Sequence, residues 1–426
     1  MPFKDWKIWF KMLPLSLKWF VLLILIRPIA DLLYFLKEVS PVLSPLYLIG
    51  ILTPLIIMVS YLSSRFPKKF PSFLTDISFK LWAFIVVLNL ILLLISQNKD
   101  LGLIGDIIKY INPIFIFVYL RHFIRDKKDL HGILQAFYYS ASIPAFLLLY
   151  EVIFNPINVE YLSEGRGGGA RMQGGYADIM NYAIYINAAL LIKFYFYLRS
   201  FYIKRIGSIS SLVGLGVVTV ICFMGLVSIK QTSSWMVAMA LGLLFVTFIV
   251  RRLQGFVLVI VLLPVIAYFA ITTYTTRIEP LVEKEYEVLE GEAEIDRSFN
   301  GRMTRWRKYS NIWLDMPLVN NLIGVGSSDD ENVPVMIGGG MHSDIVRMLF
   351  LGGVVGLLFY LLFLTSTLRS LRYMQLPERF IVLGVLGSIL LYSVSTTPLL
   401  YAPFIYFAFP VLSYAALPKP LLAPHG

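Results

Sequence analysis

Apolar runs of about twenty residues recur along the whole chain, and they constrain its fold more than any other feature. A helix of that length crosses the hydrocarbon core of a bilayer and satisfies its own backbone hydrogen bonds there. Hydrophobic residues make up 58% of the 426 positions and charged residues only 15%, unlike a folded domain in water. The sequence therefore predicts an all-α polytopic membrane protein that has the lipid bilayer as its solvent.

The apolar pattern predicts about twelve transmembrane helices, the first of them retained rather than cleaved as a signal. Lys and Arg gather in alternate loops, as the positive-inside rule requires when both termini lie in the cytoplasm. A large extracytoplasmic loop then separates the ninth helix from the tenth. The expected spans lie near 19–36, 42–62, 79–96, 107–120, 133–154, 177–198, 209–229, 232–250, 254–272, 343–364, 380–396 and 399–417.

This layout divides the chain into three parts. Helices one to nine occupy 1–272 and include an outer loop rich in Gly and Arg at 155–176, the extracytoplasmic loop occupies 273–341, and helices ten to twelve occupy 342–426. The net charge of +11 is explained by Lys and Arg in cytoplasmic loops, so no nucleic-acid partner is expected. The single cysteine, Cys222, excludes a disulfide within the chain and a metal site built on cysteines.

Two features near the N-terminus each have two interpretations. Residues 3–18 place tryptophans among lysines, which suits either a helix lying on the inner leaflet or an ordinary aromatic and basic flank. Arg27 and Asp31, four residues apart inside the first span, share one helix face. Charges at membrane depth normally face a protein interior, so we expect a structural ion pair or a role in substrate binding.

The outer loop at 155–176 contains E-G-R-G-G-G-A-R-M-Q-G-G-Y. Its glycines leave the backbone free to approach a ligand closely. The guanidinium groups of Arg166 and Arg171 suit phosphate oxygens, so the loop is a candidate diphosphate binder. A flexible loop with solvated arginines is the alternative.

The charge of the extracytoplasmic loop changes sign along the chain, from an acidic run at 279–296 to a basic and aromatic stretch at 297–309. The acidic run lacks the spacing of a calcium loop, so we expect a solvated face or a mobile flap, without a metal. In the basic stretch, Arg302, Trp306 and Tyr309 share one face at helical spacing. Such residues suit a sugar ring beside a phosphate, and equally a helix resting on lipid headgroups. The expected glycan contacts are Trp306, Arg305 and Tyr309.

His342 follows G-G-G-M and precedes an apolar helix whose first turn holds Asp344. An imidazole can take up a proton at neutral pH, and a base at the membrane surface can activate a sugar hydroxyl. His342 is the only histidine expected on the outer side, because the others fall in a cytoplasmic loop and in the tail. Asp344 either orients the imidazole or favours the helix N-terminus, and a helix-capping histidine is the alternative.

The stretch M-H-S-D-I-V-R-M-L-F-L-G-G-V-V-G-L-L-F resembles the histidine-led helix start of the O-antigen ligase and O-antigen polymerase family. The preceding G-R-M-T-R-W-R-K-Y and G-V-G are also similar, as is the large loop between the ninth and tenth spans. The resemblance implies a metal-independent, GT-C-like glycosyltransferase of the bacterial inner membrane that needs no cofactor. Such an enzyme moves a glycan from polyprenyl (undecaprenyl) diphosphate to an acceptor hydroxyl on the periplasmic side.

The resemblance can be carried over residue by residue. It implies that His342 is the base or the group that orients the acceptor, and that Arg171 is the outer-loop arginine on the diphosphate. It also implies that Arg302 matches the arginine of the family's Gly-Arg motif in the large loop. The family often has Ser-Arg-Gly near the start of the eighth span. Here that place reads K-Q-T-S-S-W, so Lys230 is the candidate for the missing charge. The implied partners are a glycan or lipid A core acceptor, and a chain-length regulator or flippase.

Three functions are therefore compatible with the sequence. We favour a polymerase of lipid-linked repeat units, because no separate acceptor feature is visible. A ligase that transfers the finished glycan to lipid A core or a protein is close to it. A flippase or secondary transporter is a different class and would need paired broken helices at mid-membrane, together with charges that line a path.

Overall fold

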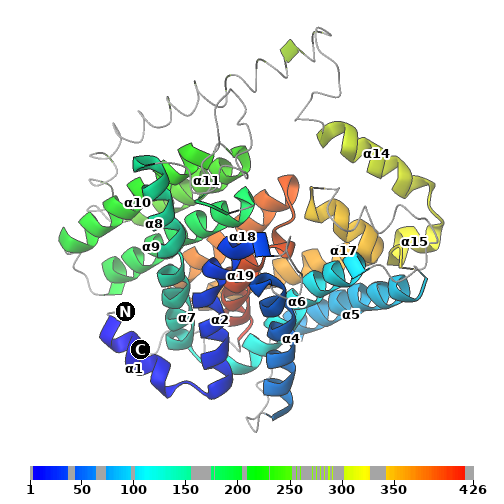
Figure 1. The fold of residues 1–426 in the computed structure, drawn as a ribbon, viewed down its shortest axis with the longest axis horizontal. Coiled ribbons are helices and arrows are strands. Elements are labelled where there is room, and N and C mark those ends of the chain that lie inside the picture. The colour runs from blue at the N-terminus through cyan, green and yellow to red at the C-terminus, as the bar shows by residue number, and fades with distance from the viewer. Residues whose placement is uncertain are drawn as a thin grey trace.

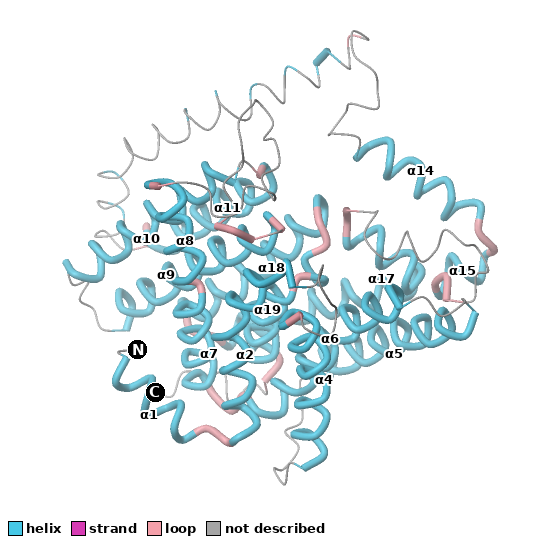
Figure 2. The backbone as a smooth tube through the Cα atoms, viewed as in Figure 1, coloured by secondary structure: helices cyan, strands magenta, loops and turns pink. Residues whose placement is uncertain are grey.

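The computed structural model describes residues 3–36, 44–63, 73–96, 101–154, 174–176, 178–203, 209–229, 231–251, 302–326 and 342–417, with scattered positions between 256 and 290. Throughout these residues helices alternate with loops and turns, and no strand is present (Figure 2). The prediction of an all-α protein is therefore confirmed for this part of the chain. The helices are α1 (Phe3–Met12), α2 (Leu15–Leu32), η1 (Leu33–Phe35), α4 (Pro45–Ser63), α5 (Phe73–Ser96), α6 (Leu101–Phe123), α7 (Lys127–Ser140), α8 (Ser142–Ile153), α9 (Ile179–Ile203), α10 (Ile209–Ile229), α11 (Thr232–Ile249), α14 (Arg302–Asp315), α15 (Leu318–Ile323), α17 (Asp344–Ser370), η7 (Leu371–Tyr373), α18 (Leu376–Ser395), η8 (Pro398–Leu400) and α19 (Ala402–Ala415).

Seven stretches of the described chain are helical, long and apolar enough to cross a membrane. Two shorter apolar helices, Leu48–Val59 and Ala402–Ala415, accompany them. The chain is therefore a multi-pass membrane protein. Most of the span predicted at 254–272 lies outside the described residues. The seven stretches are Asp76–Ile95, Lys127–Glu151, Ile179–Tyr202, Ser210–Ile229, Thr232–Ile249, Asp344–Tyr373 and Leu376–Ser395.

The helices α5, α6 and α7 begin before the spans predicted near 79–96, 107–120 and 133–154, and α7 shows a cause. The span expected from 133 begins at Lys127, because Asp126 caps α7 by accepting hydrogen bonds from the backbone N–H groups of Lys128 and Asp129. The helix then turns at Ala141 and continues as α8. A polar capping sequence lengthens this helix beyond its apolar stretch.

The bundle is built around α19, which is buried along almost its whole length. It packs against α6, α7 and α9, and Figure 1 shows α18 and α19 between two groups of helices. The helices α8 to α11 form one group, while α4, α5, α6 and α17 form the other (Figure 1). The helix α14 extends away from the body of the bundle, and α15 brings the chain back onto α17 (Figure 1).

The N-terminal features have definite structures. Arg27 and Asp31 form a buried ion pair of 2.9 Å, and the Tyr185 hydroxyl donates to the same carboxylate at 3.1 Å. This confirms the structural ion pair. The indole of Trp6 donates to the Gly132 carbonyl on α7 at 2.9 Å, and most of the polar face of α1 stays exposed. The helix thus lies against the end of the bundle where α7 begins.

Candidate functional site

The start of α17 is attached by three hydrogen bonds to the end of α18 and to the segment that follows it. The Ser343 hydroxyl donates to the Ser393 carbonyl at 2.9 Å, and the Asp344 N–H donates to the Thr396 carbonyl at 3.2 Å. The Leu399 N–H donates to Asp344 Oδ2 at 3.0 Å. Because Ser343 and Asp344 are buried, these bonds fix the first turn of α17 in place.

A buried charge pair lies within that first turn. Arg347 Nη1 is 3.7 Å from Asp344 Oδ1, and neither side chain is exposed. The guanidinium carbon also lies 5.6 Å from the centre of the Tyr110 ring on α6, where a cation is attracted to the ring face. Within the described residues the guanidinium nitrogens have no hydrogen-bond acceptor, so Asp344 and the ring are the groups that offset their burial.

The sequence patterns described above did not identify Arg347, although its spacing from Asp344 could have done so. It stands three residues after Asp344 inside an apolar run, and that spacing places both residues on one helix face. The same logic identified Arg27 and Asp31. Among the residues that the structure describes, two Arg–Asp pairs have both side chains buried, one at the start of α17 and one in α2.

His342 stands directly before this fixed turn and is exposed. Its backbone φ is 45°, the only positive value among the described residues other than glycine. Left-handed backbone is unusual for a residue with a side chain, costs about 1–3 kcal/mol and persists only where the surroundings impose it. Strained positions of this kind cluster at functional sites, and the role of His342 as a base stays a prediction.

The end of the Gly/Arg loop is held by a buried carboxylate on α8. Glu151 accepts hydrogen bonds from the N–H groups of Gly174, at 2.6 Å, and Gly175, at 3.1 Å. Both glycines have positive φ, and a Cβ on Gly174 would lie 2.9 Å from the Tyr182 ring. The turn therefore requires glycine at Gly174, which explains one part of the Gly-rich pattern.

The start of α11 is linked to α18 through a side chain on α9. Asn187 on α9 donates to the Ser234 carbonyl at 3.1 Å and to the Tyr392 hydroxyl at 2.5 Å. Tyr392 immediately precedes Ser393, which accepts the hydrogen bond of Ser343. The family resemblance expects a cation in the turn at 230–235. Hydrogen bonds through Asn187 and α18 connect this turn to Ser343, the residue after His342.

Four predicted phosphate contacts fall on residues or side chains that the structure does not describe. Arg166, Arg171 and Lys230 lie outside the described residues, and so does the side chain of Arg302, whose backbone begins α14. Their assignment to the diphosphate stays a prediction.

The helix α14 carries the predicted glycan contacts on two faces. Arg305 is exposed, whereas Trp306 and Tyr309 are half-buried. The Tyr309 ring packs edge-on against Phe350 of α17, with centroids 6.4 Å apart. The helix therefore lies beside α17 and presents its cationic side to the surroundings.

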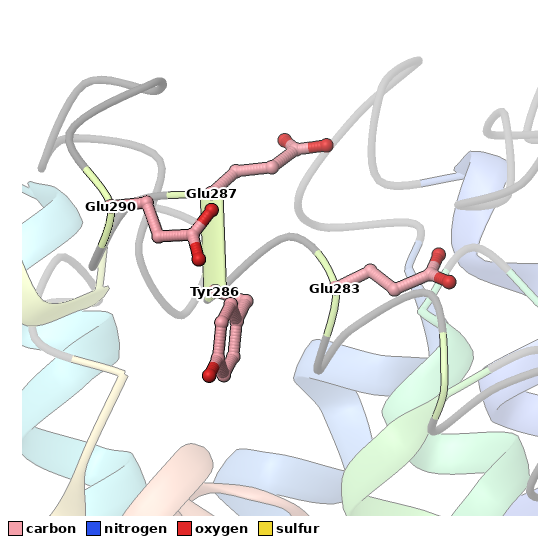
Figure 3. A pocket seen from close by; sticks show the side chains of 4 residues that line it. All are labelled: Glu283, Tyr286, Glu287 and Glu290. Atoms are coloured by element: carbon pink, nitrogen blue, oxygen red, sulfur yellow. The ribbon is translucent and has the colours of Figure 1, made fainter.

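The acidic run contributes Glu283, Glu287 and Glu290, which line a shallow hollow with Tyr286 (Figure 3). Their carboxylates do not converge on one point (Figure 3). Across the described positions, no three His, Cys, Asp or Glu side chains come together as metal ligands. This hollow has the wrong charge for a diphosphate, and His342 remains the better centre for a site.

Comparison with known proteins bears on the same region. Residues 217–361 match the O-antigen ligase family (Wzy_C), a segment that runs from α10 to the middle of α17. It includes α14, α15 and His342 but not the Gly/Arg loop. No curated protein matches the chain. Residues 217–361 of this multi-pass membrane protein are therefore a domain of the O-antigen ligase family, whose members transfer glycans in the synthesis of bacterial envelope polysaccharides.

Proposed function

We propose that this protein polymerises polyprenyl-diphosphate-linked repeat units of an O-antigen, capsule or exopolysaccharide on the periplasmic side of the inner membrane. The observation that carries the proposal is His342, an exposed residue with a strained backbone, directly before a helix start that buried contacts hold in place. A base fixed in this way suits the removal of a proton from an acceptor hydroxyl.

In the proposed reaction, the hydroxyl oxygen of the acceptor sugar attacks the anomeric carbon of the donor glycan. The bond from that carbon to the phosphate oxygen breaks, and its electron pair leaves with the polyprenyl diphosphate. The hydroxyl proton passes to the imidazole of His342. Asp344 and Arg347 act indirectly, by fixing the backbone from which the imidazole projects.

The diphosphate gains negative charge as it leaves, so fixed cations stabilise the transition state. We assign this role to Arg171 and Arg302, with Arg166 and Lys230 as further contacts. These groups replace a divalent ion in the proposal. The glycan lies along α14, where Trp306 and Tyr309 offer ring faces and Arg305 offers hydrogen-bond donors.

The proposal includes a topology. About twelve helices cross the membrane, both termini lie in the cytoplasm and the loop 273–341 lies in the periplasm. The three-part division at 272 and 341 follows from this arrangement. It places His342 at the membrane surface that a lipid-linked donor reaches.

A ligase is the second candidate, because the family matched at 217–361 is described as O-antigen ligase. Ligase and polymerase share the donor and the leaving group, and they differ in the acceptor. A polymerase takes another lipid-linked repeat unit, whereas a ligase takes lipid A core or a protein.

Purified protein supplied with lipid-linked donor separates these functions. Wild-type protein should build a ladder of longer glycans on the lipid, and His342→Ala should build none while expressing and unfolding like the wild type. A single transfer to added lipid A core, without a ladder, would identify a ligase. Wild-type turnover by His342→Ala would defeat the assignment of the base.

A further inference from the structure

A tight turn after α15 lies buried between α5 and α17. Val325, in the G-V-G turn at Gly324–Gly326, is fully buried, and its N–H donates to the Phe350 carbonyl at 2.8 Å. Asn89 on α5 holds both sides of the turn. Its Nδ2 donates to the Ile323 carbonyl at 2.5 Å, and its Oδ1 accepts from the Gly326 N–H at 2.8 Å.

Glycines make this close approach possible. A Cβ on Gly326 would lie 2.5 Å from the carbonyl oxygen of Asn89, and one on Gly353 would lie 2.3 Å from the Leu322 carbonyl. Gly353 also has a φ of 62°, which interrupts the helical backbone of α17 where α15 packs against it. Gly326 and Gly353 therefore bring backbones into direct contact.

This contact controls where α14 lies. Only Met316 and Pro317 separate α14 from α15, and α15 leads directly into the turn that Asn89 holds. Near the middle of α14, Tyr309 rests on Phe350, whose carbonyl binds Val325. The position of α14 on the bundle thus depends on one small region of α5 and α17.

The same region is rigidly linked to His342. The stretch of α17 from Asp344 to Gly353 spans between two and three helical turns, about 13 Å. Its first turn is fixed by buried hydrogen bonds, and its far end contacts α15. One short piece of helix therefore sets the distance between the imidazole and the cations of α14.

We infer that Asn89 is a positioning residue for glycan transfer. It holds the Gly324–Gly326 turn between α5 and α17 and thereby keeps Arg305 and Trp306 of α14 in register with His342. The inference rests on the proposed function. Asn89 is buried, so it acts through the elements that it holds.

Two variants disturb the turn from opposite sides. Asn89→Leu removes both hydrogen bonds from α5, and Gly326→Ala pushes the turn away from an unaltered α5. Each should speed amide exchange at 318–326 and lower kcat for transfer by roughly tenfold or more, because small misplacements of binding groups slow a reaction strongly. Donor saturation should not restore the rate.

Trp82→Phe is the matched control. It removes the indole hydrogen bond to Met348 Sδ in the same contact between α5 and α17, away from the turn. It should change thermal stability while leaving exchange at 318–326 and kcat near the wild-type values.

Two results would overturn the inference while leaving the proposed function intact. One is faster amide exchange at 318–326 in both turn variants together with glycan transfer at the wild-type rate. The other is an unchanged exchange rate in both variants. Failure of the wild-type protein to transfer glycan would instead remove the proposed function, and the exchange measurement would still report whether Asn89 holds the turn.

Discussion

The start of α17 and the helix α14 both carry residues of the predicted site, yet the protein holds them differently. At the start of α17, Asp344 and Arg347 are completely buried, and hydrogen bonds to two other elements fix the chain. On α14, Arg305 and Lys308 are exposed, and Tyr309 makes the ring contact with the bundle. One region is fixed by internal polar contacts, while the other is attached at one edge.

The difference matches the two tasks in the proposed reaction. A base must stay within a fraction of an ångström of its working geometry, which buried supporting contacts provide. A binding surface for a long glycan benefits from cations that adjust to successive sugars and phosphates. Substitutions in the two regions should therefore affect stability and activity in different proportions.

Arg347→Met should have the largest effect on stability. It leaves the Asp344 carboxylate buried without its cation, and removal of one partner from such a pair costs about 3–5 kcal/mol. Transfer should fall as well, because the first turn of α17 loses a support. Thermal unfolding of the purified protein and the transfer assay measure the two effects.

The double variant Asp344→Asn with Arg347→Met is the control for this prediction. It removes both charges together, so it should recover much of the stability lost in the single variant. If Arg347→Met unfolds like the wild type, the buried pair does not support α17, and the proposed contrast with α14 fails.

His342→Gly should have an intermediate effect of the opposite sign. Glycine adopts a positive φ without strain, so the variant should gain about 1 kcal/mol of unfolding free energy. Transfer should be lost with the imidazole. Asn also tolerates left-handed backbone, and His342→Asn should keep wild-type stability without activity. A loss of stability in both variants would show that the imidazole itself supports the fold.

Sequence patterns predicted what depends on neighbours along the chain. The apolar periodicity located the helices, and the spacing of Arg27 and Asp31 predicted an ion pair that the structure contains. Asn89 gave no such signal, because its partner Gly326 is 237 residues away. The kink at Gly353 was equally hidden, since a G-x-x-G pattern in an apolar helix does not say which backbone approaches it.

Arg305→Ala should have the smallest effect on stability, within about 0.5 kcal/mol, because the side chain is exposed and far from the buried contacts. Arg305 is one of several contacts on α14, so its loss should lower kcat less than displacement of the whole helix by Asn89→Leu. If Arg305 binds the lipid-linked donor, the KM for that donor should rise a few-fold. Added salt should shrink the difference between variant and wild type, because the donor phosphates attract an exposed cation through solvent. Lys128→Ala, an exposed cation where α7 begins, is the matched control and should leave the KM unchanged. Equal KM values for Arg305→Ala and Lys128→Ala would mean that α14 does not bind the donor, and the surface assigned to the glycan would have to lie elsewhere.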